Sequence, residues 1–243
     1  MPKSVLNSGP RTSTSAPTSG AKREINNRFA QKALSNMTQD ADSHETKTHK
    51  DWHDRTYLPH WDKEHLIQSI TFRLADSLPK HVVDEYLEAD DETKKMRIIE
   101  RGLDQGAGNC WLGDSVIAKT VEDAFLFFDE TRYRLLAWVV MRNHVHVVVE
   151  QFQGYPLGDV VKSWKNFTAR KANKQLNRIG AFWAEDYYDR YIRNVEHLDS
   201  VIAYIHENPQ KSGLCASAED WRWSSVRLLR RKPKVRPSAD GWF

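Results

Sequence analysis

Two apolar segments separated by only two residues constrain the fold of this chain more than any other feature. Residues 133–141 (YRLLAWVVM) and 144–152 (HVHVVVEQF) are rich in the β-branched and aromatic residues that favour strands. The two residues between them are Arg142 and Asn143. This is the length of a tight antiparallel hairpin connection, and asparagine tolerates the positive φ that such turns require. The sequence therefore predicts a β-hairpin over residues 133–152.

One further strand and several amphipathic helices are expected around this hairpin. Residues 67–74 alternate apolar and polar side chains as a half-buried strand does. Apolar residues recur at helical spacing in four segments, 81–102, 117–128, 158–178 and 195–208. Pro209 and Gly213 are expected to stop the last helix. The predicted fold class is α+β, a small antiparallel sheet with helices packed on one face.

Composition indicates how the chain is divided. Residues 1–55 are polar and poor in aromatic side chains, so we expect a largely disordered extension. A folded domain over 56–228 and a basic tail over 229–243 follow. No apolar run approaches the roughly 18 residues of a membrane span, so no membrane association is expected. The two cysteines, Cys110 and Cys215, are too few for a disulfide framework, which favours a reducing compartment.

The basic residues are gathered in blocks, although the net charge is only +3. Residues 161–178 and 227–236 each contain six basic side chains and no acidic one. Blocks of one sign are either solvated faces or the electrostatic footprint of a protein that binds a phosphate backbone. Both interpretations stay open on charge alone.

Two histidines stand two residues apart on the second strand of the hairpin. Because side chains alternate along a strand, His144 and His146 point to the same face, with Cα atoms roughly 7 Å apart. The valines between and after them, Val145, Val147 and Val149, then face the core on the other side. Two neutral imidazoles at this spacing can bind one divalent ion if a second element supplies more ligands. The alternative is a histidine pair that only packs against the sheet.

The last predicted helix offers such a second element. Its core stripe consists of residues at i, i+3, i+4 and i+7, namely Leu198, Val201, Ile202 and Ile205. Tyr204 and Asn208 lie one turn apart along the edge of that stripe. On spacing alone, Tyr204 could equally be a boundary aromatic residue and Asn208 a helix cap before Pro209.

The order of these motifs resembles the HUH single-strand endonucleases, within them the IS200-like tyrosine transposases, and most closely the REP-associated tyrosine transposases. The similarity spans about residues 56–228. It is carried by ITFRLADSLP, CWLGD, RYRLLAWVVMRNHVHVVVE, SWKNFTARKAN, FWAEDYYDRYIRN, YIHENPQKSGL and WRWSS, in this order. Two positions depart from the family pattern: Arg142 stands where proline is common, and His206 where asparagine is common.

The resemblance implies a ferredoxin- or RRM-like sheet of the HUH endonuclease type. It also implies a DNA nicking and strand-transfer enzyme that acts on hairpin-forming repetitive palindromic DNA. It implies that His144, His146 and Asn208 bind Mg²⁺ or Mn²⁺. Tyr204 would attack the scissile phosphate and form a 5′-phosphotyrosine with release of a free 3′-hydroxyl. The expected partner is single-stranded or hairpin DNA, with no small-molecule substrate. We expect a monomer in the cytoplasm, associated with a bacterial-type nucleoid.

Basic side chains are expected to hold the DNA backbone: Lys162, Lys165, Arg170, Arg190, Arg193, Arg230 and Arg231. The main alternative is a domesticated DNA-binding protein that keeps this scaffold without cleaving DNA. A histidine-triad nucleotide hydrolase would need a third histidine where Val148 stands. A 2H phosphodiesterase would need two His-x-Ser/Thr pairs, and none occurs in a suitable context.

Overall fold

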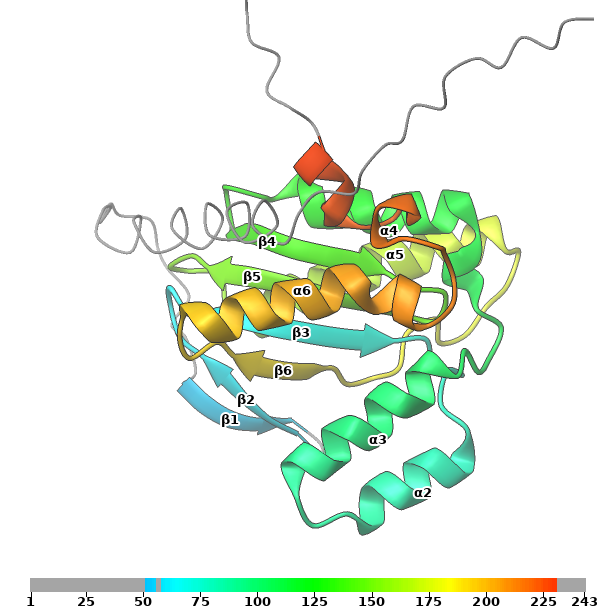
Figure 1. The fold of residues 1–243 in the computed structure, drawn as a ribbon, viewed down its shortest axis with the longest axis horizontal. Helices are drawn as coiled ribbons and strands as arrows, with labels where there is room; N and C mark the ends of the chain where they lie inside the picture. The colour runs from blue at the N-terminus through cyan, green and yellow to red at the C-terminus, as the bar shows by residue number, and fades with distance from the viewer. Residues whose placement is uncertain (1–50, 56–57, 231–243) are drawn as a thin grey trace, which may run out of the picture.

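The fold is centred on a four-stranded antiparallel sheet. The computed structural model describes residues 51–55 and 58–230. In spatial order the strands are β4 (Tyr133–Val140), β5 (His144–Gln151), β3 (Ile67–Arg73) and β6 (Tyr188–Tyr191), and neighbouring strands are antiparallel (Figure 1). A two-stranded antiparallel sheet pairs β1 (Asp51–Arg55) with β2 (Leu58–Asp62).

The connections between the strands follow the ferredoxin-like order. Helix α4 (Ser115–Phe127) precedes β4, and α5 (Leu157–Gln175) connects β5 to β6. With β3 and β5 in the centre of the sheet, this is a β-α-β-β-α-β arrangement. The predicted α+β class and the small antiparallel sheet are therefore confirmed.

The hairpin has the predicted position and length. Val140 pairs with Val145, and the Met141 amide donates a hydrogen bond of 2.9 Å to the His144 carbonyl. Arg142 and Asn143 form the turn, but neither adopts a positive φ. The left-handed backbone freedom of asparagine is thus not why a short polar residue stands there.

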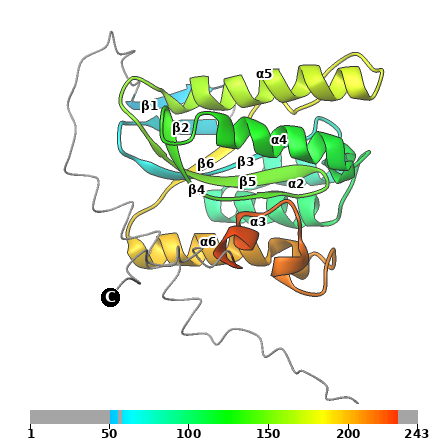
Figure 2. The ribbon, with the colours of Figure 1, turned by 90° about the horizontal axis from the view of Figure 1, so that it is seen from above.

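Helices cover both faces of the sheet, which corrects the expectation that they pack on one face. One apolar core lies between the sheet and the α4–α5 layer and contains Val145, Val147 and Val149. A second core lies on the opposite face, where α6 (Val195–Lys211) packs against residues that include Val148 (Figure 2). The physical reason is that β4 and β5 have apolar side chains on both faces, such as Val147 on one and Val148 on the other, so both faces need a cover.

Two short helices extend from the end of β3. The predicted helix at 81–102 is in fact two helices, α2 (Lys80–Glu88) and α3 (Glu92–Asp104). Asp91 starts the second one, because its side chain accepts a hydrogen bond of 2.7 Å from the Lys94 amide. Helix α3 lies on the same side of the sheet as α6 (Figure 2).

Helix α6 continues through Pro209, which was expected to stop it. A proline removes one backbone donor, and here the loss falls in the last turn of the helix, where neighbouring hydrogen bonds still form. The Ser212 amide donates to the Asn208 carbonyl at 2.9 Å. The helix ends at Lys211, and after the cap residue Ser212 the chain turns away at Gly213, whose φ of 69° is the left-handed conformation that glycine adopts freely.

Several boundaries differ from the sequence-based prediction. Strand β1 begins at Asp51, so residues 51–55 do not belong to a disordered extension. Strand β6 was not predicted, because four residues give too short a pattern to recognise. A short 3₁₀ helix, η3 (Ser225–Arg230), overlaps the start of the predicted tail. Residues 1–50 and 231–243, with the remainder of the predicted extension and tail, lie outside the described residues. Among the helices of the described ranges, none has the length and apolar character needed to span a membrane.

Candidate active site

The two histidines of β5 form a closely spaced, buried pair on the α6 face of the sheet. His144 and His146 are exposed by only 1% and 3%. Their Nε2 atoms lie 3.1 Å apart, and the two rings are nearly perpendicular. Burial lowers the pKa of His146 to about 4 and the pKa of His144 well below its ordinary value, with His146 as a second cause for His144. Both rings are therefore neutral at pH 7, which is the form that binds metals.

The other ring nitrogen of each histidine, Nδ1, has a hydrogen-bond partner of its own. The Nδ1 atom of His144 lies 2.7 Å from Oδ1 of Asn143. The Nδ1 atom of His146 lies 2.7 Å from the Thr71 hydroxyl oxygen, on the strand that pairs with β5. Outer hydrogen bonds of this kind fix the orientation of metal-ligating histidines. From the sequence, Asn143 had been assigned only to the hairpin turn, and Thr71 had no assigned role.

Helix α6 places Tyr204, the predicted nucleophile, and the amide of Asn208 on the face of the sheet that carries the histidine pair. The Tyr204 ring meets the His146 ring edge to face, with 5.5 Å between centroids. The Asn208 side chain is buried and hydrogen-bonds the Tyr204 hydroxyl. The structure thus gathers His144, His146, Tyr204 and Asn208 on one face of the sheet, as the sequence pattern anticipated. Their individual roles in binding and catalysis stay predictions.

Carboxylates of α3 complete the surroundings of Tyr204. Burial raises the pKa of the Tyr204 phenol above its ordinary value, and the nearby charges of Glu100 and Asp104 raise it further. The hydrogen bond from Asn208 acts in the opposite direction. In the free protein the phenol is therefore strongly held in its protonated form.

An open depression between α3 and α6 exposes Tyr204. Its lining consists of polar and charged residues from these helices and the turns after them: Arg97, Glu100, Arg101, Asp104, Gln105, Tyr204, Lys211 and Ser212. The Lys211 ammonium lies 5.6 Å from the centre of the Tyr204 ring. Sequence reasoning missed the contribution of α3. The available signal was the i, i+4 spacing of Arg97 with Arg101 and of Glu100 with Asp104, which places each pair on one side of the helix.

The donor set of the site fits a divalent metal ion. Two neutral imidazoles direct their Nε2 atoms to one point, and their other nitrogens are already engaged. Within residues 51–55 and 58–230 there is no group of three His, Cys, Asp or Glu side chains arranged to hold a metal. The Asn208 amide remains the predicted third protein ligand.

The basic helix is not part of this site. Helix α5 packs on the opposite face of the sheet from α6 (Figure 2), and its Lys162 and Arg170 are exposed there. Lys165 donates a hydrogen bond of 2.6 Å to the Glu185 carbonyl, so it also has a structural contact. A DNA-binding role for these three residues stays a prediction, but it requires DNA that reaches the far face.

Two other predicted DNA-binding residues lie closer to the site. Arg190 is exposed on β6. Burial and the charge of Asp104 raise the pKa of Glu100 on α3, and the charge of Arg190 offsets part of this rise. Arg193 is also exposed. Burial lowers the pKa of His197, and the charges of Arg190 and Arg193 lower it further. The Arg230 side chain and the whole of Arg231 lie outside what the structure describes.

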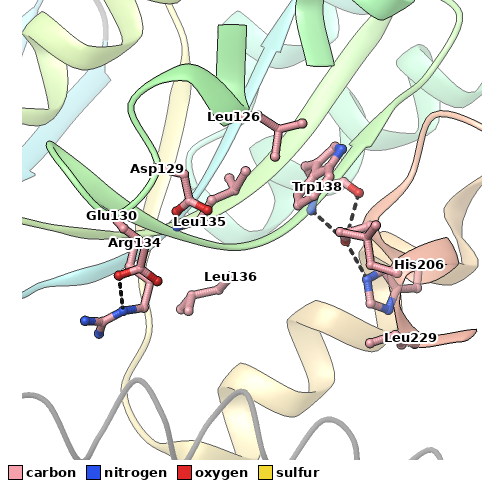
Figure 3. A pocket seen from close by; sticks show the side chains of 11 residues that line it. Leu126, Asp129, Glu130, Arg134, Leu135, Leu136, Trp138, His206 and Leu229 are labelled. Atoms are coloured by element: carbon pink, nitrogen blue, oxygen red, sulfur yellow. Dashed lines mark hydrogen bonds and ion pairs between the residues drawn. The ribbon is translucent and has the colours of Figure 1, made fainter. Parts of the chain in front are cut away.

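The two departures from the family pattern leave the histidine pair intact. His206 points into a separate cavity that Trp138 and Leu229 also line, and its Nε2 atom lies 2.8 Å from the Ser225 hydroxyl (Figure 3). Arg142 has an exposed side chain, and its carbonyl accepts a hydrogen bond from the Leu112 amide.

Comparisons with known proteins gave one family-model match and one similar solved structure. The comparison with curated proteins gave no match. Among solved structures, the chain is similar to a REP-associated tyrosine transposase bound to a REP hairpin, with 14% sequence identity and a TM-score of 0.47 over 72% of this chain and 84% of that chain. Residues 115–208 match the family model described as "Transposase IS200 like".

Proposed function

We propose that the protein is a metal-dependent endonuclease and strand transferase for single-stranded DNA with hairpin-forming palindromic repeats. The observation that carries the proposal is the position of Tyr204 against His146, whose Nε2 atom converges with that of His144. A buried, neutral histidine pair beside a tyrosine combines a metal site with a nucleophile. The family match over residues 115–208 includes all of these residues.

In the proposed reaction the Tyr204 oxygen forms a bond to the scissile phosphorus, and the bond from phosphorus to the 3′-oxygen breaks. The products are a 5′-phosphotyrosine and a free 3′-hydroxyl, so the phosphodiester energy is kept for rejoining. The phenol has to give up its proton in this step. Its raised pKa opposes that loss, and Asn208 assists because its hydrogen bond favours the phenolate.

His144, His146 and Asn208 would hold the divalent ion. The ion would supply Lewis-acid stabilisation of the charge that develops on the phosphate. Imidazole donors suit transition metals better than Mg²⁺, whereas an amide oxygen suits both Mg²⁺ and Mn²⁺. The mixed donor set therefore favours Mn²⁺ over Mg²⁺ in affinity, and Mg²⁺ would act through its greater abundance.

The proposal is tested by incubating the full chain with end-labelled single-stranded oligonucleotides that contain a palindromic hairpin and unpaired flanks. We expect a nick and a covalent protein–DNA adduct with Mn²⁺ or Mg²⁺, and neither product with EDTA. A protein that binds the hairpin but gives no adduct under any metal condition would instead be the non-cleaving DNA-binding alternative.

Light scattering of the protein with and without DNA checks the expected monomer.

We place this activity in the cytoplasm on nucleoid DNA. The support is the DNA-processing family match and the state of Cys110 and Cys215, which are both free thiols and half-buried. Fractionation of cells into membrane, soluble and nucleoid-bound protein would test the location.

A further inference from the structure

The partners that hold the two histidine rings differ in what they can accept and donate. The Asn143 amide nitrogen donates to two backbone carbonyls, those of Leu103 at 3.1 Å and Ala107 at 3.3 Å. This orients the amide, so the atom 2.7 Å from His144 Nδ1 is its oxygen. An amide oxygen only accepts hydrogen bonds. His144 must therefore carry its proton on Nδ1, and its Nε2 atom keeps a lone pair.

Because its partner is Thr71, His146 can adopt either neutral tautomer, whereas His144 can adopt only one. A threonine hydroxyl can donate or accept a hydrogen bond. The Thr71 oxygen, 2.7 Å from His146 Nδ1, is therefore compatible with either neutral form of that ring. His146 Nε2 lies 3.1 Å from His144 Nε2, the atom that carries the lone pair.

Without a metal, two facing lone pairs in a buried site would repel each other and leave polar atoms unsatisfied. The contact is favourable when His146 carries its proton on Nε2 and donates it to His144. The Thr71 hydroxyl then donates to His146 Nδ1. A metal ion bound to both Nε2 atoms requires the other neutral form of His146, with its proton on Nδ1.

We propose that Thr71 is a positioning residue that lets His146 change tautomer when a divalent ion binds, while Asn143 holds His144 in one tautomer throughout. The His146 ring releases the Nε2 proton to solvent and takes up one proton on Nδ1, so its charge does not change. The Thr71 hydroxyl turns from donor to acceptor. This inference rests on the metal site of the proposed function, but its description of the metal-free state does not.

The direct test is ¹⁵N NMR of the histidine-labelled full chain, which distinguishes a proton on Nδ1 from one on Nε2. In the metal-free protein we expect His144 with Nδ1–H and His146 with Nε2–H. Saturation with Mg²⁺, or with Zn²⁺ as a second diamagnetic probe, should leave His144 unchanged and move the His146 proton to Nδ1. A metal-free His146 with Nδ1–H, or a bound state with the same tautomer as the free state, would overturn the inference.

Failure of the proposed function has a different signature. If Mg²⁺, Mn²⁺ and Zn²⁺ all fail to bind, the metal site and the switch that depends on it are both wrong, while the metal-free tautomers can still agree with the structure. If metals bind and DNA is cleaved with an unchanged His146 tautomer, only the role of Thr71 is wrong.

Variants of Thr71 give an independent measurement of its positioning role. Thr71→Ser keeps the hydroxyl and should keep the Mn²⁺ dissociation constant within about twofold, measured by electron paramagnetic resonance. Thr71→Val keeps the shape but removes the hydroxyl, and should weaken Mn²⁺ binding by about 10-fold or more, as expected for an outer hydrogen-bond partner. The matched control is Ser69→Ala, two residues earlier on the same face of β3. Equal affinities for Thr71→Val and the wild type, with both proteins folded by circular dichroism, would contradict the proposal.

Discussion

The side-chain oxygen of Asn143 lies 2.7 Å from Nδ1 of the adjacent residue His144. The same side chain donates hydrogen bonds to the carbonyls of Leu103 and Ala107, at the end of α3 and in the loop after it. The turn residue therefore connects the histidine pair to the helix that contributes carboxylates beside Tyr204. A short polar residue is needed at this turn because of its side-chain contacts.

Replacement of this residue should affect metal binding and folding together. Asn143→Ala leaves His144 Nδ1 without its partner and removes one hydrogen bond from each of two carbonyls, so we expect about 10- to 100-fold weaker Mn²⁺ binding. The free energy of unfolding should fall by about 1–3 kcal/mol. Calorimetric titration and urea unfolding measure the two effects. Arg142→Ala, at the exposed neighbouring turn position, is the control and should change neither quantity appreciably.

Tyr204→Phe should abolish the covalent adduct, because it removes the attacking oxygen, while hairpin DNA still binds within a few-fold of wild-type affinity. Denaturing gel electrophoresis detects the adduct, and fluorescence anisotropy measures binding. Tyr191→Phe is the matched control, since this tyrosine is exposed on β6 and has an asparagine at i+3 instead of i+4. Adduct formation by Tyr204→Phe would assign the nucleophile to another residue.

His144→Ala and His146→Ala should each remove high-affinity Mn²⁺ binding and cleavage. Each change also leaves a buried partner, Asn143 or Thr71, without its hydrogen bond. We therefore expect the metal-free protein to lose about 1–3 kcal/mol of stability as well. Metal binding that survives both replacements would favour a histidine pair that only packs against the sheet.

The metal-free protein should lose stability as pH falls from about 6.5 towards 4. Below about 6.5 the unfolded imidazole of His146 takes up a proton, whereas the folded one stays neutral until its pKa of about 4. The unfolded state then binds more protons, so the free energy of unfolding decreases as pH decreases. Urea unfolding in EDTA at several pH values measures this slope. The slope should be smaller in His146→Gln than in the wild type and unchanged in His81→Gln, an exposed control.

Cations around the depression should contribute more to single-stranded DNA binding than those on α5. Arg97→Ala and Lys211→Ala remove charges from the lining that includes Tyr204. For each phosphate that a removed cation had neutralised, the slope of log K against log salt concentration should become shallower by about 0.7. The matched changes Lys162→Ala and Arg170→Ala lie on the opposite face. Anisotropy titrations at several salt concentrations compare the two pairs, and a larger effect from the α5 pair would place the DNA on the far face.

The histidine face and the hairpin were predictable because strand periodicity is a local property. His144 and His146 share a face whatever packs against it, and the valines that alternate with them face the opposite core. The pairing of Tyr204 with Asn208 followed in the same way from helical periodicity. The break between α2 and α3 was missed although no apolar residue stands between Ala89 and Met96, because the capping contact of Asp91 is visible only in the structure.

By itself, the sequence determined the strand and the helix that carry the candidate ligands, and the face of each on which these ligands lie. Both follow from periods of 2 and 3.6 residues, which relate near neighbours in the chain. Only the tertiary structure decided which residues meet those faces. The register of β3 against β5 places Thr71 opposite His146, 75 residues away. The packing of α6 on the face opposite α5 brings Tyr204 to the histidines and leaves the basic helix on the far side. Such contacts depend on strand register and on which apolar surfaces bury each other, and no local pattern encodes either.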